Sequence, residues 1–441
     1  MFVIFLISLQ KIGCTSAKHS SMLDVLPSVC TIITMKRFKR YFRCTVLFLF
    51  LLSAFGARAQ RSAEFVEMSM DSVEISLLTC QPRQNVYSLY GHTAIRYEDK
   101  AAGVDLAVNY GMFSFSKPFF VLRFVFGLTD YTMDIEPFAD FFAQYSHYGC
   151  GVRQQVLNLT AGEKAAIGHA IDVNFQPENR VYRYNYFYDN CTTRARDILV
   201  GHLQGRVVYD TTNVAHPSYR EMTHGYNTGH PWARMGNDML LGVKADLPTD
   251  NAQQQFLPDN LRKDFDKAVI VDSDGVRRPL VLRSFWVIPP TVPVVESEFP
   301  LTPMQCATIL LVVVAGCTLY ECLRRKNFWG LDALLMLADG LCGLILLAMV
   351  FSEHPTVSLN FQILLLCPLS LVFLYPVAKA LRRHRIHWWM YVHAALIVVY
   401  FALGCWQTYA EGMNIVALSL LIRYSGKAWQ CSPTNKNKQF R

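Results

Sequence analysis

The stretch Tyr184–Leu199 reads Tyr-Asn-Tyr-Phe-Tyr-Asp-Asn-Cys-Thr-Thr-Arg-Ala-Arg-Asp-Ile-Leu and changes character at its centre. Its aromatic first half is typical of a strand, and the residues after Asn190 favour a helix. We therefore expect Cys191 at the N-terminus of a helix, where free backbone N–H groups and the helix dipole favour a thiolate. The stretch alone leaves two interpretations, a nucleophilic cysteine or a small buried apolar residue near a helix cap.

The composition of the 441-residue chain is too apolar for an ordinary soluble protein. Hydrophobic residues make up 52% and charged residues 17%, against about 25% charged residues in average globular chains. The apolar excess lies near the N-terminus and after residue 300. The net charge of +8 does not indicate nucleic-acid binding, because much of the basic excess flanks apolar segments and no basic stripe with interleaved aromatic residues is present.

The N-terminal region has the pattern of a secretory signal peptide. Basic residues after Met35 precede the apolar run Thr45–Phe55, and Ala57-Arg58-Ala59 supplies an Ala-x-Ala cleavage site. We predict a signal peptide over 35–59, cleaved after Ala59, and expect 1–34 to be an extension that precedes the true start. An uncleaved anchor is the alternative, but the apolar run is short for a bilayer span. No cysteine follows in a lipobox position, so we do not expect the chain itself to be a lipoprotein.

Residues 60–300 are expected to form one exported α+β domain. Thr160 and Glu163 have the spacing of a capping box, so a helix should begin there. The predicted elements are strands at 72–78, 87–97, 104–113 and 181–188, and helices at about 160–174 and 192–203. From about residue 206 we predict a β-rich extension with many turns, which includes a strand over 279–288.

After residue 300 the chain has the pattern of a bundle of four to five transmembrane helices. Four segments are long enough to span the roughly 30 Å hydrocarbon core, and a fifth is shorter: Met304–Leu323, Phe328–Phe351, Phe361–Leu381, Trp388–Tyr409 and Asn414–Tyr424. Basic residues follow the first and third segments and the last, whereas the loops Ser352–Asn360 and 408–414 carry no Lys or Arg. The positive-inside rule places the exported domain and the Ser352–Asn360 loop on the same, outer side. We predict a transmembrane domain over 301–425 and a basic cytoplasmic tail over 426–441.

The exported domain holds three cysteines, Cys80, Cys150 and Cys191. An odd number in an oxidising compartment leaves at least one thiol unpaired within the chain. Cys80 and Cys150 have the option of a disulfide, which the sequence does not decide. The other cysteines are expected to be small apolar residues.

A nucleophilic cysteine needs a base, and His92 is the best-placed candidate. It follows Gly91 at the start of a predicted strand, so its ring is expected at a sheet edge. Asp105 and Asn109 share one face of the neighbouring strand, and we favour Asn109 as the group that orients the imidazole. Asn190 and the backbone N–H of Cys191 are candidate oxyanion donors.

Each of these assignments has a structural alternative. His92 alone is compatible with a hydrogen-bonded core histidine, and Asn109 with ordinary hairpin polarity. The other histidines of the exported domain form no His-Glu-x-x-His or Cys-x-x-Cys pattern, so we expect structural or surface roles rather than metal binding. They are His147, His169, His202, His216, His224 and His230.

These residues carry a resemblance to a known family. The blocks Gly91-His92-Thr93-Ala94-Ile95-Arg96, Asn109-Tyr110-Gly111 and Tyr188-Asp189-Asn190-Cys191-Thr192-Thr193-Arg194, with the trailing apolar spans, resemble the Lnb-type lipoprotein N-acyltransferases. The resemblance covers most of the chain after residue 60, and the Asp-Asn-Cys-Thr-Thr-Arg block is its most specific part. It implies a papain-like exported domain joined to a C-terminal membrane domain. The order of His before Cys is similar to circularly permuted members of the NlpC-type and lecithin:retinol acyltransferase-like thiol superfamily.

The resemblance implies that His92 is the base and Cys191 the nucleophile, while Asn109 remains our own inference. The implied reaction moves a fatty acyl chain from a phospholipid, through a cysteine thioester, to the α-amino group of a lipid-modified N-terminal cysteine of a lipoprotein. It needs no metal or cofactor, and its partners are membrane lipids and lipoproteins rather than nucleic acid. It would place the protein in the bacterial cytoplasmic (inner) membrane, with the catalytic domain on the periplasmic side.

Candidate substrate contacts come from three places in the chain. The phenylalanine-rich segment around 113–126 either lines an acyl site at the membrane surface or belongs to the core. The outward loop at 352–360 either touches a head group or the incoming amine, or is a plain solvated loop. Two arginines either bind phosphate or form structural ion pairs. The residues concerned are Phe119, Phe120, Glu353, His354, Arg96 and Arg194.

Two other functions use the same features. A membrane-anchored cysteine peptidase or amidase would cut cell-wall peptide with the same nucleophile, although a single anchor would suffice for it. A non-enzymatic envelope assembly protein would use Cys191 only as a structural residue. Four or five spans favour a lipid-handling site, and therefore acyl transfer.

Overall fold

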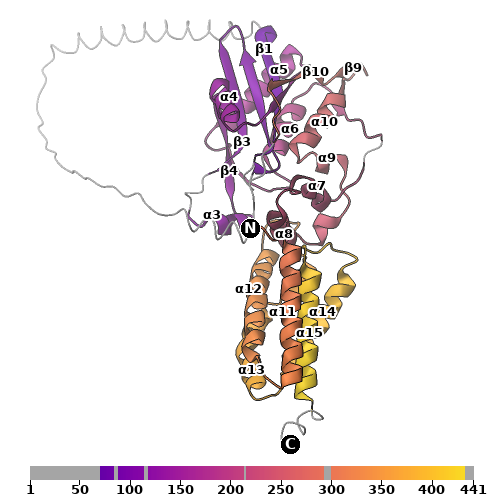
Figure 1. The fold of residues 1–441 in the computed structure, drawn as a ribbon. Helices are drawn as coiled ribbons and strands as arrows, with labels where there is room; N and C mark the ends of the chain where they lie inside the picture. Colours follow the sequence, from indigo (N-terminus) through magenta and orange to yellow (C-terminus); the bar gives the residue numbers. More distant parts are fainter. Residues whose placement is uncertain (1–69, 84–87, 114–117, 213–214, 293–298, 433–441) are drawn as a thin grey trace, which may run out of the picture.

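The computed structural model describes residues 70–83, 88–113, 118–212, 215–292 and 299–432. The predicted signal peptide over 35–59, the extension before it and most of the basic tail lie outside the described residues. Figure 1 shows a part built on a β-sheet standing on one end of a helical bundle. The expected α+β domain followed by a helical membrane domain is therefore confirmed.

A seven-stranded sheet organises the first part of the chain, in the order β10-β5-β1-β2-β3-β4-β6. All neighbouring strands are antiparallel, and β2 and β3, which overlap two of the predicted strands, pair as a hairpin. In the β1–β2 pair, Cys80 lies opposite His92. The strands are β1 Val73–Cys80, β2 His92–Asp99, β3 Val104–Met112, β4 Asp130–Pro137, β5 Val152–Leu157, β6 Val181–Arg183 and β10 Val281–Ile288.

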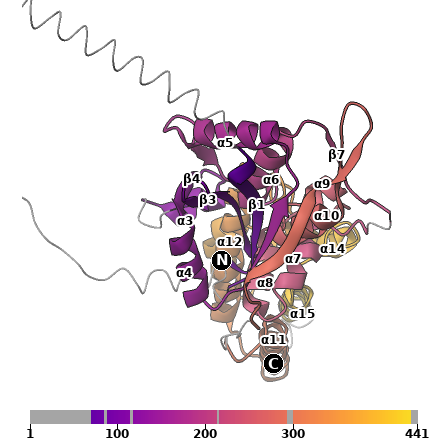
Figure 2. The ribbon, with the colours of Figure 1, turned by 90° about the horizontal axis from the view of Figure 1, so that it is seen from above.

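Helices cover both faces of this sheet (Figure 2). On one face, α5 (Ala161–Phe175), α6 (Cys191–Gly201) and α10 (Pro258–Lys267) pack against apolar residues of the strands, among them Ile75 and Ile95. On the other face, α4 (Phe138–His147) packs against Leu78 and Ala94. Burial of these side chains supplies the main driving force that holds the helices to the sheet.

Two local predictions differ in outcome. The capping box of Thr160 and Glu163 is present and opens α5, as predicted. The strand predicted over 181–188 is wrong beyond Arg183, because Asn185 and Asp189 pair with each other across a tight turn. That turn leads directly into α6.

The β-rich extension predicted from about residue 206 is also wrong. The region is mainly helical, and its turn signals are helix starts: Ser218 and Glu221 form a capping box, and Pro231 and Pro258 occupy first helical positions. Its own sheet has three strands of three residues each, and only β10 joins the main sheet. The remaining elements are α7 Tyr219–Tyr226, α8 Pro231–Leu240, α9 Asn251–Gln254, β7 Arg206–Val208, β8 Val269–Val271 and β9 Arg277–Pro279, with short 3-10 turns at Met70–Ser72 and Val243–Asp246.

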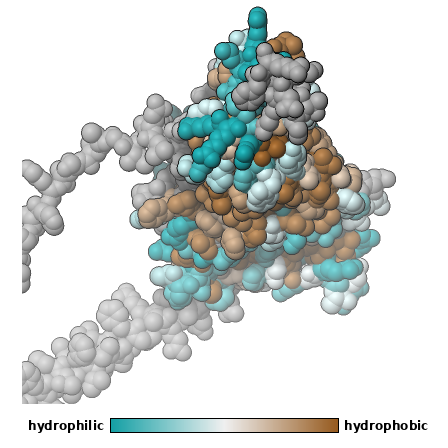
Figure 3. All heavy atoms as spheres, turned by 90° about the horizontal axis from the view of Figure 1, so that it is seen from below, coloured by the Kyte–Doolittle hydropathy of each residue, from teal (hydrophilic) through white to brown (hydrophobic). Residues whose placement is uncertain are grey.

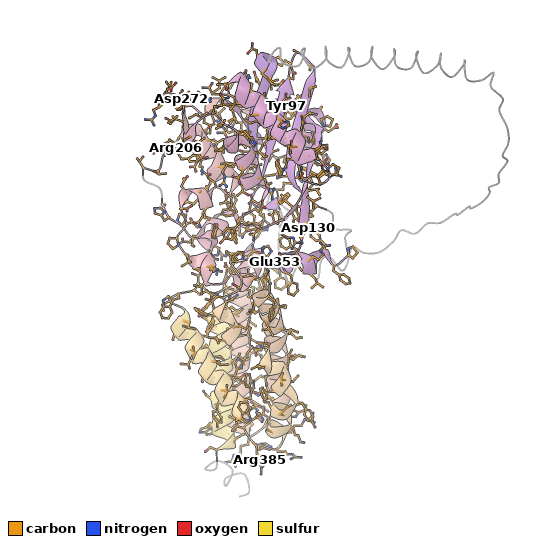
Figure 4. All side chains as sticks on the ribbon, turned by 180° about the vertical axis from the view of Figure 1, so that it is seen from behind. Tyr97, Asp130, Arg206, Asp272, Glu353 and Arg385 are labelled. Carbon is orange, nitrogen blue, oxygen red and sulfur yellow. The ribbon has the colours of Figure 1, made fainter. Side chains whose placement is uncertain are left out.

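The bundle consists of α11 Pro303–Arg324, α12 Trp329–Val350, α13 Leu369–Arg382, α14 Trp388–Leu403 and α15 Met413–Cys431, with a 3-10 turn at Phe361–Leu364 before α13. Three stretches are long and apolar enough to cross a membrane, namely Pro303–Arg324, Trp329–Val350 and Phe361–Arg382, and α14 is a shorter apolar helix. Seen from below, the bundle has a hydrophilic end beside a broad hydrophobic surface (Figure 3). Arg385 lies at the end of the bundle farthest from the sheet (Figure 4), as the positive-inside rule requires.

The last helix is longer than the predicted segment 414–424 and continues past residue 425 to Cys431. Its charged side chains are buried against partners on α11 and α12. Arg423 donates to Asp332 at 2.8 Å and also contacts Glu321, and Lys427 donates to Glu321 at 2.9 Å. The sequence did not show the full length of this helix, because charged residues that are buried in ion pairs cannot be told from the exposed charges of a tail by residue type.

We predict that Arg423→Met destabilises the bundle by about 3–5 kcal/mol, because it leaves carboxylates buried without their main partner. Thermal unfolding in detergent measures the change. Arg385→Met, at the exposed end of the bundle, is the matched control and should leave the transition temperature unchanged. Equal transition temperatures for the two variants would contradict a stabilising role for the buried network.

Candidate active site

Cys191 is the first residue of α6, and the preceding residue fixes it there. The side-chain oxygen of Asn190 accepts hydrogen bonds from the backbone N–H groups of Thr192 and Thr193, at 2.9 and 3.0 Å. In return, Thr193 Oγ1 accepts from the Asn190 N–H at 2.9 Å. This reciprocal cap holds the start of the helix, and hence the thiol, in one place.

The expected role of Asn190 as an oxyanion donor is not supported. Its side-chain N–H₂ group donates to the carbonyl oxygens of Tyr186 and Phe256, at 3.0 and 2.9 Å. Because both donors are engaged and its oxygen caps the helix, Asn190 positions Cys191 rather than contacting substrate. The Cys191 N–H stays the better candidate, since the first N–H groups of a helix have no acceptor within it.

His92 reaches the thiol because of the glycine before it. Gly91 has a φ of 78°, and a Cβ at this position would lie 2.5 Å from the carbonyl oxygen of Cys80. Only glycine therefore allows β2 to start this close to the end of β1. The imidazole lies close enough to Cys191 for the two groups to shift each other's pKa.

Asn109 of β3 lies against the imidazole, as the sequence suggested. His92 Nε2 and Asn109 Oδ1 are 3.0 Å apart, and Asn109 Nδ2 donates to Glu136 Oε1 at 2.7 Å. A carboxylate only accepts, so the amide nitrogen faces Glu136 and the amide oxygen faces His92. Nε2 of His92 then carries the hydrogen, which leaves Nδ1 for the thiol.

Glu136 is a member of this chain of contacts that sequence reasoning missed. It belongs to β4, which pairs with β3, and the register sets Glu136 opposite Ala107, so that its side chain lies diagonal to Asn109 and accepts its hydrogen bond. Burial raises the pKa of this carboxyl, while the hydrogen bond from Asn109 acts in the opposite direction. No local motif marks Glu136, because its position depends on strand pairing across 27 residues.

The electrostatics of the site favour a thiolate–imidazolium pair. Burial raises the pKa of the Cys191 thiol, but the charge of His92 and hydrogen bonds from His92, the Thr93 backbone and Thr192 lower it by more. Conversely, burial lowers the pKa of His92, and the interactions with Cys191 and Asn109 raise it by more. The two shifts widen the pH range over which both groups are charged.

Backbone packing brings α6 and β3 into contact beside the thiol. A bulge shifts the register of β3 between Asn109 and Met112, and Gly111 within it has a φ of 90°. A Cβ on Gly111 would lie 3.5 Å from the Cβ of Cys191. Thr93 lies on the adjacent strand β2, and its hydroxyl is 3.1 Å from the hydroxyl of Thr192 in α6. The Asn109-Tyr110-Gly111 block thus supplies both a polar partner and a close approach.

The two arginines proposed as phosphate ligands are engaged in ion pairs instead. Arg96 donates twice to Asp105, both at 2.8 Å, and once to Gln154. Arg194 donates twice to Asp189, at 2.5 and 2.6 Å, across the turn that precedes α6. The structural alternative therefore fits both, and their guanidinium groups stabilise the sheet and the turn.

The phenylalanine-rich segment forms α3 (Phe120–Val125) at the membrane-facing end of the sheet (Figure 1). Phe119 is 76% exposed and precedes the helix in a left-handed conformation. Phe120 faces inward and stacks on Phe113, whose ring stacks on Tyr131. Of the two predicted substrate contacts, Phe119 is therefore at the surface and Phe120 lies in an aromatic cluster.

Glu353 and His354 attach the bundle to this segment, so the loop faces the exported domain as predicted. The Glu353 N–H donates to the Phe126 carbonyl at 2.9 Å, and His354 Nε2 lies 3.1 Å from the Phe124 carbonyl. The Glu353 carboxylate also pairs with Arg183 at 2.8 Å. Figure 4 shows Glu353 near Asp130 at the junction of the two parts. These contacts make the loop a structural clip rather than a plain solvated loop.

Among the described residues, no three metal-ligating side chains lie together. Cys80 and Cys150 are both buried free thiols. The reactive groups that the structure brings together here are the Cys191 thiol and the His92 imidazole, with their neighbours Asn109 and Thr192.

The fold and the site define a membrane protein whose exported α/β domain carries a cysteine–histidine pair. Comparison with protein families adds the next step: the family model for the Lnb N-terminal periplasmic domain matches residues 60–225, and the model for the Lnb transmembrane domain matches residues 294–434. Together they match more than half of the chain, and the protein belongs to the Lnb family. It is a membrane protein with a periplasmic domain. No curated protein and no solved structure matches the chain.

The paired pKa shifts give a testable pH dependence. We predict that alkylation of Cys191 by iodoacetamide persists to a lower pH than for an ordinary thiol, because the lowered pKa keeps the thiolate present there. His92→Ala should move the alkylation profile to higher pH, since it removes the lowering interactions and leaves the burial. Mass spectrometry of the Cys191 peptide measures the rate. His169→Ala, at an exposed position of α5, should leave the profile in place, and a profile insensitive to His92 would refute the pair.

Proposed function

We propose that this protein is a lipoprotein N-acyltransferase of the inner membrane. In this proposal, Cys191, His92 and Asn109 transfer a fatty acyl chain from a phospholipid to the α-amino group of a lipid-modified N-terminal cysteine. The observation that carries it is the position of the Cys191–His92 pair at the end of the sheet where β2 begins and β3 ends, from which the chain continues into α3 and its contact with Glu353. The phospholipid and the lipoprotein are both held in a membrane. A thiol at the membrane-facing end of the domain therefore requires little movement of either substrate out of the membrane.

The first half-reaction forms a thioester. The Cys191 thiolate adds to the ester carbonyl carbon of the phospholipid, and the carbonyl electron pair moves to the oxygen. The tetrahedral intermediate collapses with cleavage of the C–O ester bond, and His92 protonates the departing lysophospholipid oxygen. Asn109 holds the imidazole so that Nδ1 faces the thiol throughout.

The second half-reaction returns the thiol. The amino group of the acceptor adds to the thioester carbonyl, and neutral His92 takes the proton that the nitrogen loses. Collapse of this intermediate breaks the C–S bond and forms the amide. The same base thus acts as acid in the first step and as base in the second, as microscopic reversibility requires.

A run of stacked aromatic rings supports a lipid substrate. The run extends from Phe120 through Phe113 and Tyr131 to Tyr184, with ring centroids 5.4, 4.9 and 4.1 Å apart, and the exposed Phe119 directly precedes Phe120 in the chain. Tyr131 and Tyr184 lie close enough to Cys191 for its charge to raise their pKa further, beyond the rise that burial causes. This apolar surface connects the membrane-facing end of the domain to the thiol, and we assign it to the acyl chain.

We predict that protein incubated with phospholipid labelled in its acyl chain acquires label at Cys191 in a form that neutral hydroxylamine removes. The thioester should accumulate without acceptor and disappear when a lipid-modified peptide with a free α-amino group is added. Cys191→Ser should abolish the labelling, and Cys150→Ser, at a buried thiol outside the site, is the matched control. Labelled phospholipid that never marks Cys191, or release of cell-wall peptide fragments instead, would exclude acyl transfer.

A second prediction concerns Phe119. Phe119→Ser should lower the rate of thioester formation from phospholipid in vesicles roughly tenfold, because about 1.5 kcal/mol of apolar burial is lost. The rate with a short-chain, water-soluble thioester donor should stay unchanged. Val276→Ser is the matched control, since Val276 is equally apolar and 63% exposed in the β8–β9 turn at the far end of the domain. A tenfold loss with both donors, or with neither, would contradict a role for Phe119 in lipid access.

A further inference from the structure

Tyr182 is a buried tyrosine beside the nucleophile that the mechanism above does not use. It is the middle residue of β6, with Val181 and Arg183 exposed on either side, and it is 6% exposed. The Arg194 guanidinium lies over its ring, 4.2 Å from the centroid. Its ring is therefore held between the sheet and the first turn of α6.

The hydroxyl of Tyr182 lacks a hydrogen-bond partner among the residues that the structure describes. A buried hydroxyl without a partner costs free energy that a phenylalanine at the same position would avoid. The hydroxyl of neighbouring Tyr110, by contrast, donates to Asn174 at 3.0 Å. The Tyr182 hydroxyl is therefore available to donate a hydrogen bond to a substrate atom that enters the site.

The Tyr182 hydroxyl and the nucleophile lie beside the same backbone position of β3. Gly111 has no side chain, and a carbon placed at its Cβ position would lie 3.5 Å from Cys191 Cβ, 3.9 Å from Tyr182 Oη and 3.9 Å from Tyr131 Cδ2. All three are ordinary van der Waals distances, so the Tyr182 hydroxyl and Cys191 converge on the same side of β3 at Gly111. Tyr182 therefore presents an unpaired hydrogen-bond donor close to the nucleophilic residue.

We propose that Tyr182 Oη–H is an oxyanion donor of this site, acting with the backbone N–H of Cys191. When the thiolate adds to a carbonyl carbon, the C–S bond forms and the carbonyl electron pair moves to the oxygen, which carries the negative charge. Tyr182 donates a hydrogen bond to that oxygen and keeps its proton, and the bond is lost again when the intermediate collapses. The role fills the position that Asn190 cannot take, because both amide hydrogens of Asn190 are engaged.

This inference rests on the thiol chemistry of the proposed function, but its test does not depend on the lipid substrates. The full-length protein in detergent is titrated with octanal, which forms a hemithioacetal with Cys191 and develops charge on oxygen. Protection of Cys191 from iodoacetamide reports octanal binding, and the rate without octanal reports the thiolate alone, because alkylation develops no oxyanion. Tyr182→Phe should weaken octanal binding by roughly 10- to 100-fold and leave the alkylation rate unchanged.

Tyr110→Phe is the matched control, because it removes a hydroxyl from the same cluster that already has a protein partner. It should leave octanal binding unchanged. Equal octanal binding by the Tyr182→Phe variant and the unaltered protein would overturn the assignment, as would a parallel loss of octanal binding and alkylation, which would indicate a general disturbance of the thiol. If lipid acyl transfer were absent while the octanal difference persisted, the proposed substrate would be wrong and the oxyanion role would stand.

Discussion

The packing of the first turn of α6 against the ends of β2 and β3 is the contact on which the site depends. It brings together residues from three distant parts of the chain, and small side chains make it possible. Gly111 adopts the positive φ of the β3 bulge beside Cys191, and Gly91 allows β2 to begin beside Cys80. The Thr93–Thr192 hydroxyl pair then ties the helix to the strand. A larger residue at either glycine would need backbone movement, because both have a positive φ.

Sequence reasoning located the parts of the site that local chemistry marks. A cysteine after a helix-capping asparagine, a histidine after a glycine and an asparagine on the next strand are each visible in a few residues, and the structure brings His92 and Asn109 into contact. Glu136 was missed because only the register of β3 and β4 places it beside Asn109. The helices after residue 206 were missed because proline and serine at helix starts resemble turn signals when no long apolar periodicity follows.

Polar residues near Cys191 show why residue type alone does not assign a role. Asn190 and Arg194 both flank Cys191 in sequence and have the chemistry of substrate ligands. Their hydrogen bonds are nevertheless used to build the turn and the cap that present the thiol. The distinction depends on whether donors are already engaged, which only the three-dimensional structure records. The same test separates the paired hydroxyl of Tyr110 from the unpaired hydroxyl of Tyr182.

The attachment of the periplasmic domain to the bundle affects the free energy of moving the proposed lipid substrate from the bilayer to the site. Each methylene of an acyl chain that leaves the bilayer for water costs about 0.8 kcal/mol, so a catalytic thiol well above the membrane would make the donor ester expensive to reach. The clip between Glu353 and Phe126 holds α3 at the junction of the domain and the bundle. Stacked rings from Phe120 to Tyr184 then offer an apolar surface over the remaining distance. In the proposed reaction, an acyl chain that moves from lipid to these rings never exposes its full length to water, and this lowers the free energy of bringing its ester to Cys191.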